Sequence, residues 1–324
     1  MSKAKLYKLT NTLLSFLLAI AALIYLFYLF QQKLEKVELL AAFELLNENG
    51  TVLILVVLLM PLNWLIETYK WRYLLLKVQP LGLWKSLQSI LLGTLLSLLS
   101  PNRTGELAGR LLYVEKSNRW QVFYVNLICS LSQLSNTFFF GLCAIIYWRL
   151  NLQNIFKLDQ SWIAVLSVLG ILVLAFLYTS SNGIWKLLRF FNRKFDRNAL
   201  ILKYSLKDRL ILFSYSTLRY FVFVLQFVTL LMVLDSSISF YEAFFIVALI
   251  YVLTAAIPTA WISDFPIRTS IAYFLLESFG FSGLAGLIAS VSLWLINLFI
   301  PALLGLTILP KLNWLSLTKL KIND

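Results

Sequence analysis

The stretch from Leu95 to Tyr113 reads LLSLLSPNRTGELAGRLLY and decides the expected fold. An apolar run ends at Ser100-Pro101, a polar segment follows, and a second short helix is expected to begin near Leu107. Proline lacks a backbone donor and pushes the preceding residue out of helical space, so one continuous helix is not expected here. The stretch is therefore either two half-helices that meet at a polar tip or a short loop between two spanning helices. Half-helices inside lipid need protein or a water-filled cavity to satisfy the freed backbone groups.

The composition defines the class of protein. The chain has 324 residues, 60% of them hydrophobic, and apolar runs close to the roughly 20 residues that span a bilayer recur along it. This predicts an all-α polytopic membrane protein with a single membrane domain over residues 1–324. The absence of histidine excludes His-based acid–base catalysis and the commonest metal ligand. Because Cys129 and Cys143 lie in one apolar segment, no disulfide framework or Cys-based metal site is expected. No other metal site and no cofactor are expected.

The net charge of +13 does not by itself indicate nucleic acid as a partner. In a membrane protein, the distribution of charge between loops carries more information than the sum. The apolar run from Leu13 to Phe30 is long, bulky and without a small-residue cleavage site. A retained first helix is therefore expected rather than a signal peptide.

Six spanning helices are expected, with two polar breaks between them. The helices are predicted over residues 11–30, 52–76, 121–148, 162–179, 210–234 and 284–309. The first break separates half-helices at 86–100 and 105–116, and the second separates half-helices at 242–258 and 267–279. The mixed-charge segment 31–50 is predicted to be an interfacial amphipathic helix or a loop.

The distribution of Lys and Arg distinguishes the two interpretations of the opening stretch. If both interrupted pairs are re-entrant and return to the side from which they came, 22 Lys and Arg lie inside and five lie outside. If residues 87–100 cross the membrane completely, the basic cluster Ser181–Arg209 moves outside, against the positive-inside rule. The re-entrant arrangement is therefore favoured, with both termini cytoplasmic and the protein in the cytoplasmic (inner) membrane.

This arrangement contains an internal repeat. Residues 1–150 hold three spanning helices and the re-entrant pair 86–116, and residues 160–310 hold three more and the pair 242–279. The first pair enters from the cytoplasm and the second from outside, so the two halves have inverted topology. Inverted repeats with broken helices are typical of alternating-access transporters.

Two sequence motifs resemble a known family. NWLIETYKWRYLL at the end of the second helix, followed by SPNRTGELAGRLLYV, is similar to the membrane region of lysylphosphatidylglycerol synthases and their stand-alone, flippase-like relatives. That family has an aromatic-Arg element, a Pro-x-Arg-x-Gly-Glu break and a later Pro…Gly-x-Arg-Glu break. In the second break here, IPTAWISDFPIRTS, Pro266 stands at the Gly position and Thr269 at the Glu position. The family's synthases also carry a soluble aminoacyltransferase domain, and since no segment here is a candidate for one, lipid aminoacylation by this chain alone is not expected.

Arg103, Glu106 and Arg110 are the first candidate substrate-binding residues. Arg103 lies at the tip beside the N-terminus of a half-helix, an arrangement that suits a phosphate headgroup. Glu106 and Arg110 share a helical face at i, i+4 spacing, and Glu106 is expected to orient the arginines or carry a coupling proton. The alternative is a structural Arg-Glu pair that stabilises the break.

Three further candidates lie in the second half. Asp264 and Arg268 form the corresponding polar set in the second break, with a structural role as the alternative. Arg219 lies ten residues into the helix 210–234, with Gln226 two turns later on the same face. An ionisable residue at that depth costs at least about 2.5 kcal/mol and needs a partner. Arg219 is therefore expected to line a cavity or to extend its side chain to the surface.

Two other polar features are less specific. Glu67, near the end of the second helix, is expected to form an interface salt bridge with Lys70 and Arg72. A polar stripe on the third helix is interpreted as interhelical contact or as a cavity wall, and consists of Asn126, Ser130, Gln133 and Asn136.

The function expected is transport of an anionic or polyprenyl-phosphate-type lipid across the membrane, with Arg103, Arg110, Arg219 and Arg268 neutralising the headgroup. The chain is expected not to be an enzyme, although a membrane-embedded lipid-modifying enzyme is one alternative. A non-catalytic membrane subunit of a lipid-modifying or envelope-assembly enzyme is the other. A homodimer is compatible with each of these functions.

Overall fold

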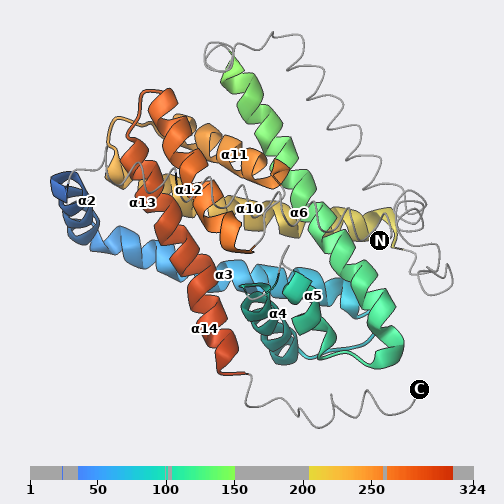
Figure 1. Cartoon of the computed structure of the whole chain (residues 1–324). Coiled ribbons are helices and arrows are strands. Elements are labelled where there is room, and N and C mark those ends of the chain that lie inside the picture. Colours follow the sequence, from blue (N-terminus) through green and yellow to red (C-terminus); the bar gives the residue numbers. More distant parts are fainter. Residues whose placement is uncertain are drawn as a thin grey trace, which may run out of the picture.

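The computed structural model describes residues 36–98, 104–149, 204–257 and 261–308, together with Ile24 and Ser100. All regular structure within these ranges is helical, and they contain no strand. The elements follow one another as α2 (Lys36–Glu48), α3 (Gly50–Leu75), α4 (Leu83–Leu98), α5 (Thr104–Leu111), η2 (Lys116–Asn118), α6 (Arg119–Tyr147), α10 (Leu206–Leu234), α11 (Phe240–Ala256), α12 (Trp261–Ser278), α13 (Gly283–Trp294), η4 (Leu295–Phe299) and α14 (Ile300–Leu306) (Figure 1).

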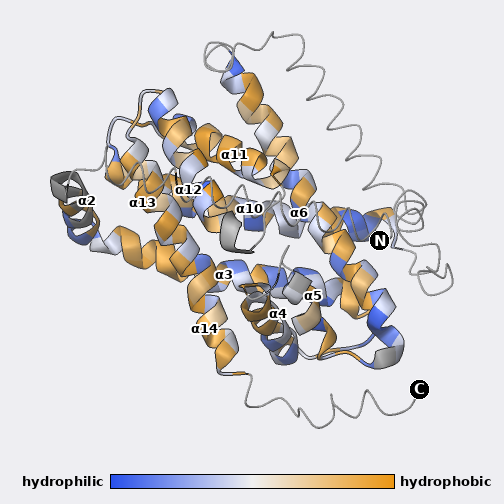
Figure 2. Cartoon of the chain, viewed as in Figure 1, coloured by the Kyte–Doolittle hydropathy of each residue, from blue (hydrophilic) through white to orange (hydrophobic). Residues whose placement is uncertain are grey.

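Within the described residues, four helices are long and apolar enough to cross a membrane, judged by length and composition: Gly50–Leu75, Arg119–Tyr147, Leu206–Leu234 and Gly283–Leu306. They agree within about one helical turn with the predicted helices 52–76, 121–148, 210–234 and 284–309. Helices α4 and α11 are shorter and also apolar. Apolar residues cover most of α6, α11 and α14 (Figure 2). Apart from Ile24, the predicted helix 11–30 lies outside the described residues, as do the predicted helix 162–179 and the basic cluster up to residue 203.

The first predicted break is present as a helix pair. Helix α4 ends at Leu98, and α5 begins at Thr104 and runs beside it (Figure 1). Helix α5 ends at Leu111, earlier than the expected residue 116, and the separate turn η2 follows. The sequence places proline at the right point for this break but does not define the length of the second helix.

Glycines allow α4 and α5 to pack backbone against backbone. A Cβ atom on Gly109 would lie 2.3 Å from the amide nitrogen of Gly93, and one on Gly105 would lie 2.0 Å from the carbonyl oxygen of Leu96. Gly105 and Gly109 form a small-xxx-small pattern, which permits this close approach between membrane helices. Any side chain at these positions would separate the pair.

The second break is narrower than the sequence analysis predicts. Helix α11 ends at Ala256, but α12 begins at Trp261, so Pro266 lies inside α12 rather than before it. A proline in a helix removes the hydrogen bond to the carbonyl four residues earlier. Here that carbonyl belongs to Ile262, in the first turn of α12, so only one bond near the helix start is lost. The helix continues because its later residues pack closely against α13.

Helices α3 and α10 form an antiparallel pair across the centre of the described structure. At one end, the hydroxyl of Tyr73 donates to Oδ1 of Asp208 over 2.9 Å, and at the other end Nε2 of Gln226 donates to the carbonyl of Val56 over 2.7 Å. Two further pairings connect the early and late parts of the chain, since α6 packs against α11 and α14 packs against α4.

A π-helical turn lies at the centre of the last spanning segment. Pro301 in α14 has no N–H to donate to the carbonyl of Asn297, and the helix widens to the π-turn η4 at this point. Asn297 is buried there and donates over 3.0 Å to Gln226 of α10. Nδ2 of Asn63 on α3 also lies 3.5 Å from Oδ1 of Asn297. A chain of buried amides therefore joins α3, η4 and α10.

Asp235, at the end of α10, anchors two turns. Its carboxylate accepts from the amide of Ser282, at the start of α13, over 2.7 Å, and from the hydroxyl of Ser237 over 2.6 Å. Partial burial raises the pKa of this carboxyl, but the hydrogen bonds from Ser237 and Ser282 outweigh burial and hold the pKa below its usual value.

Candidate functional site

Glu67 on α3 is the centre of a buried ion cluster. The residue is 4% exposed, and its carboxylate lies 2.7 Å from Lys70 and 2.9 Å from both Arg110 and Arg219. The predicted interface salt bridge with Lys70 and Arg72 is therefore wrong in part. Nε of Arg72 instead donates to the carbonyl of Leu81 over 2.9 Å, because Arg72 lies on another face of α3.

Arg110 connects α5 to α3 and α6. Its guanidinium is held from three directions, since Nη1 donates to Asn126 over 2.5 Å and Nη2 donates to Glu67 and to Glu106. It also lies over the ring of Trp71, with 5.6 Å from Cζ to the ring centroid. The predicted i, i+4 pair with Glu106 is present, at 2.5 Å. Arg110 is 1% exposed, so its side chain lies in the protein interior.

Arg219 connects α10 to the same cluster. Nε donates to Oδ1 of Asn63 over 2.8 Å, and Nη1 lies 2.9 Å from Oε2 of Glu67. The guanidinium also stacks over the rings of Trp64 and Phe223, at 5.6 and 5.2 Å from their centroids. Arg219 therefore has a buried partner at depth, as an ionisable residue in a spanning helix requires.

The cluster carries more positive than negative charge. In the described residues, the carboxylates of Glu67 and Glu106 face three cations, Lys70, Arg110 and Arg219. Burying ions is costly unless charges are paired and the remaining polar atoms are hydrogen-bonded. The excess of one cation makes the surroundings favourable for an additional anion.

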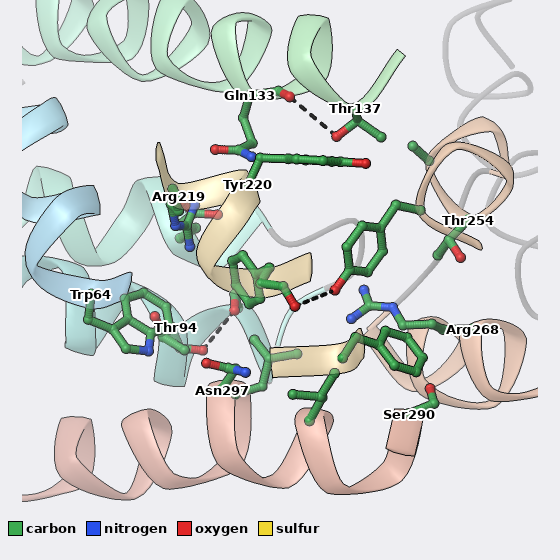
Figure 3. A pocket seen from close by; sticks show the side chains of 18 of the residues that line it. Trp64, Thr94, Gln133, Thr137, Arg219, Tyr220, Thr254, Arg268, Ser290 and Asn297 are labelled. Atoms are coloured by element: carbon green, nitrogen blue, oxygen red, sulfur yellow. Dashed lines mark hydrogen bonds between the residues drawn. The ribbon is translucent and has the colours of Figure 1, made fainter. Parts of the chain in front are cut away.

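A cavity of about 350 Å³ lies beside the cluster and is bounded by early and late helices (Figure 3). Its wall includes Glu106 from α5, Arg219 from α10 and Arg268 from α12. Neutral polar side chains complete much of the lining, namely Thr94, Ser97, Gln133, Thr137, Tyr220, Tyr251, Thr254, Ser290 and Asn297. Three of the six predicted substrate-binding residues therefore meet at one cavity.

Three residues that line the cavity carry a polar atom without a hydrogen-bond partner in the described structure. Within the described structure, Nε1 of Trp64, Oε1 of Gln133 and the hydroxyl of Tyr220 are buried and have no hydrogen-bond partner. Buried polar groups are normally paired, and each unpaired one costs free energy.

Three predicted site residues remain, and among them only Arg110 has a described side chain. Arg103 lies outside the described residues, and the side chain of Asp264, in the first turn of α12, does so too. Arg110 lies in the ion cluster behind the wall. Lys70 and Arg110 are two of the 22 Lys and Arg residues assigned to the inside, within segments 70–85 and 103–119. Both are 1% exposed, so they belong to this buried cluster and not to the charges of a cytoplasmic loop.

The predicted polar stripe of α6 forms part of the cavity wall and also makes interhelical contacts, the two roles that the sequence left open. Gln133 lines the cavity, whereas Asn136 accepts a hydrogen bond from Thr217 of α10 over 2.6 Å and so holds two helices together. Asn126 accepts from Arg110, and Ser130 is exposed.

Glu67 and Asn63 belong to the site, but neither is among the site residues predicted from the sequence. Both lie inside an apolar helix at i, i+4 spacing, so they share one face. An acidic residue within a spanning helix is by default a candidate functional residue. That signal is present in the sequence, but the adjacent Lys70 and Arg72 gave it a simpler local explanation.

The fold and the site define a helical membrane protein with a buried charged centre between early and late parts of the chain. The family described as the lysylphosphatidylglycerol synthase TM region matches residues 13–305, and the chain belongs to this family. Together with the four apolar helices among the described residues, this makes it a multi-pass membrane protein. A comparison with curated proteins found no match.

Proposed function

We propose that the chain translocates an anionic lipid across the cytoplasmic membrane, with the headgroup passing through the cavity between Arg219 and Arg268. The observation that carries this proposal is the meeting of two arginines, from α10 and α12, at one cavity with an excess of buried positive charge. Arginine is suited to phosphate because its planar guanidinium offers a fork of donors.

The size of the cavity favours a headgroup rather than a whole lipid. At about 350 Å³ it lies at the low end of the range for small-molecule pockets, about 300–1,000 Å³. A phosphate with a small polar substituent fits such a space, whereas acyl chains do not. The chains would therefore stay in the surrounding hydrocarbon while the head moves through protein.

The helix packing supports an inverted repeat as part of this proposal. If α3 to α6 correspond in order to α10 to α14, a two-fold relation requires that contacts between the halves occur in exchanged pairs. Helix α6 packs against α11, and the exchanged pair, α14 against α4, is also present. The corresponding helices α3 and α10 pack against each other in antiparallel orientation. Such repeats carry substrate sites at their interface, which is where the cavity lies.

The proposed topology has six spanning helices, two re-entrant pairs and cytoplasmic termini. It is compatible with a homodimer. Labelling of a single cysteine at position 190 tests the orientation, because this position belongs to the basic cluster Ser181–Arg209. Labelling from the cytoplasmic side only is expected. Labelling from outside would contradict the six-helix arrangement.

The two alternatives make different predictions for the purified protein. A membrane-embedded enzyme would change the lipid chemically, which mass spectrometry of the recovered lipid detects. A non-catalytic subunit would neither move nor modify lipid in the absence of its enzyme. The proposed transporter moves unmodified lipid on its own.

The test is translocation of fluorescent phosphatidylglycerol in phosphatidylcholine vesicles containing the purified protein. Arg219→Gln and Arg268→Gln are expected to slow translocation by about tenfold or more, the equivalent of one lost charge-assisted hydrogen bond. Lys85→Gln is the matched control, because Lys85 is exposed on α4 and does not line the cavity. Wild-type rates in both arginine variants would contradict the proposal.

A further inference from the structure

Glu67 divides its two carboxylate oxygens between different partners. Among the described contacts, Oε1 binds Arg110 at 2.9 Å, whereas Oε2 binds both Lys70 at 2.7 Å and Arg219 at 2.9 Å. If Arg219 moved away, Oε2 would keep Lys70 and Oε1 would keep Arg110. The carboxylate is therefore not left unpaired by the loss of Arg219, which removes most of the usual cost of breaking a buried ion pair.

Arg219 is also the one cation of the three bound to Glu67 that lines the cavity in the described structure. Its side chain is 15% exposed, compared with 5% for Glu67 and 1% for Arg110. The described hydrogen bonds of Arg219 use Nε and Nη1 and none uses Nη2. A ligand in the cavity can therefore reach Arg219 without reaching Glu67.

These observations point to competition for one guanidinium. We propose that Glu67 is a positioning residue that holds Arg219 at the cavity wall while the cavity is empty and yields this contact to the phosphate group of an incoming ligand. The inference rests on the proposed function, since it assumes that the ligand carries a phosphate. That phosphate belongs to a lipid headgroup or to a soluble phosphate ester.

Competition of this kind has a kinetic purpose. A transported ligand must bind strongly enough to enter but weakly enough to leave. An arginine with no carboxylate partner would retain a phosphate, whereas the return of Glu67 to Arg219 favours release. Glu67 therefore lowers affinity and raises the rate of release.

The test combines calorimetric binding in detergent with vesicle translocation of fluorescent phosphatidylglycerol. The binding probes are dihexanoyl phosphatidylglycerol, sn-glycerol 3-phosphate and, as a zwitterionic control, dihexanoyl phosphatidylcholine. Glu67→Gln is expected to bind the phosphatidylglycerol probe about tenfold more tightly, because one charge-assisted contact to Arg219 no longer competes with the ligand. Its translocation rate at saturating lipid is expected to fall. Glu115→Gln, a change at an exposed carboxylate away from the cavity, is expected to change neither.

A second variant covers the case in which Glu67→Gln does not fold. In Glu67→Gln/Lys70→Gln, a negative and a positive charge are removed together, so the cluster keeps its net charge while Arg219 still loses its carboxylate. The same tighter binding and slower translocation are expected of this double variant. A merely structural role of Glu67 would instead weaken binding and translocation together.

The possible results separate the inference from the proposed function. Unchanged or weaker phosphatidylglycerol binding in the folded variants, with normal wild-type binding, overturns the inference and leaves the transporter in place. A wild-type protein that binds neither dihexanoyl phosphatidylglycerol nor sn-glycerol 3-phosphate overturns both. If sn-glycerol 3-phosphate binds as tightly as the lipid, and more tightly in the variants, the inference stands and the assignment to lipid is wrong.

Discussion

Oε2 of Glu67 lies 2.9 Å from Nη1 of Arg219, and this ion pair joins two helices whose residues are 152 positions apart in the chain. Lys70 and Arg110 share the same carboxylate. The pair thus couples the stability of the α3–α10 contact to the charge balance at the cavity wall. A change at Glu67 is expected to affect both.

Removal of the Glu67 charge should destabilise the protein strongly. In Glu67→Ala, three buried or partly buried cations lose a shared partner, and breaking a buried pair from one side costs about 3–5 kcal/mol. The melting temperature in detergent should therefore fall clearly, while Glu115→Ala, at an exposed position, should leave it nearly unchanged. Equal melting temperatures for the two variants would show that the cluster does not hold the helices together.

Arg110→Lys should also destabilise the protein, although the charge is conserved. The guanidinium bonds Asn126, Glu67 and Glu106 through two nitrogens, and a lysine ammonium on a flexible stem does not reproduce this fork. A loss of about 2 kcal/mol is expected from the contacts that are not replaced. Thermal unfolding in detergent measures it, and a wild-type melting temperature would mean that the charge alone matters.

A methyl group between α4 and α5 should separate the first helix pair. In Gly109→Ala, the new Cβ would lie 2.3 Å from the backbone nitrogen of Gly93, which cannot move aside as a flexible side chain could. Overpacking of this kind costs about 1–3 kcal/mol or more. Gly82→Ala is the matched control, because nothing lies within 4 Å of the added atom there. Equal thermal stability of the two variants would contradict the close packing of α4 on α5.

Asp235 should contribute to stability in a pH-dependent way. Because hydrogen bonds from Ser237 and Ser282 lower its pKa in the folded protein, its contribution is present above the unfolded-state pKa and is lost as pH falls through the folded-state value. Asp235→Asn should therefore be less stable than the wild type at pH 7, and the two melting temperatures should converge in acid. A difference that stays constant with pH would rule out the ionised carboxylate as the source.

The sequence was sufficient to predict the positions of the helices that have long apolar runs. The spans of α3 and α10 could be predicted to within about one helical turn, because the hydrophobic effect determines which residues lie in lipid. Pro101 indicated the break after α4. Pro266 misled the prediction of α12, because a proline near the start of a helix removes only one hydrogen bond. Packing against α13 decides that boundary, and local sequence does not reveal it.

The candidate site was predictable only in part, for a related reason. Arg219, Arg268 and Glu106 attract attention as charges in apolar surroundings, and all three line the cavity. The role of Glu67 depends on Arg110 and Arg219, which are 43 and 152 positions away. Contacts at that separation follow from tertiary structure. The predicted role of Arg103 stays a prediction.

Protection of a cavity cysteine from chemical modification tests most directly whether an anionic headgroup enters between Arg219 and Arg268. Thr137→Cys places a thiol on the cavity wall once Cys129 and Cys143 are replaced by alanine. A small methanethiosulfonate reagent should modify this thiol, and dihexanoyl phosphatidylglycerol, but not dihexanoyl phosphatidylcholine, should slow the reaction. Ser117→Cys, in the exposed turn η2, should react equally with and without lipid. Modification of the Thr137→Cys thiol at the same rate with and without phosphatidylglycerol would contradict the account.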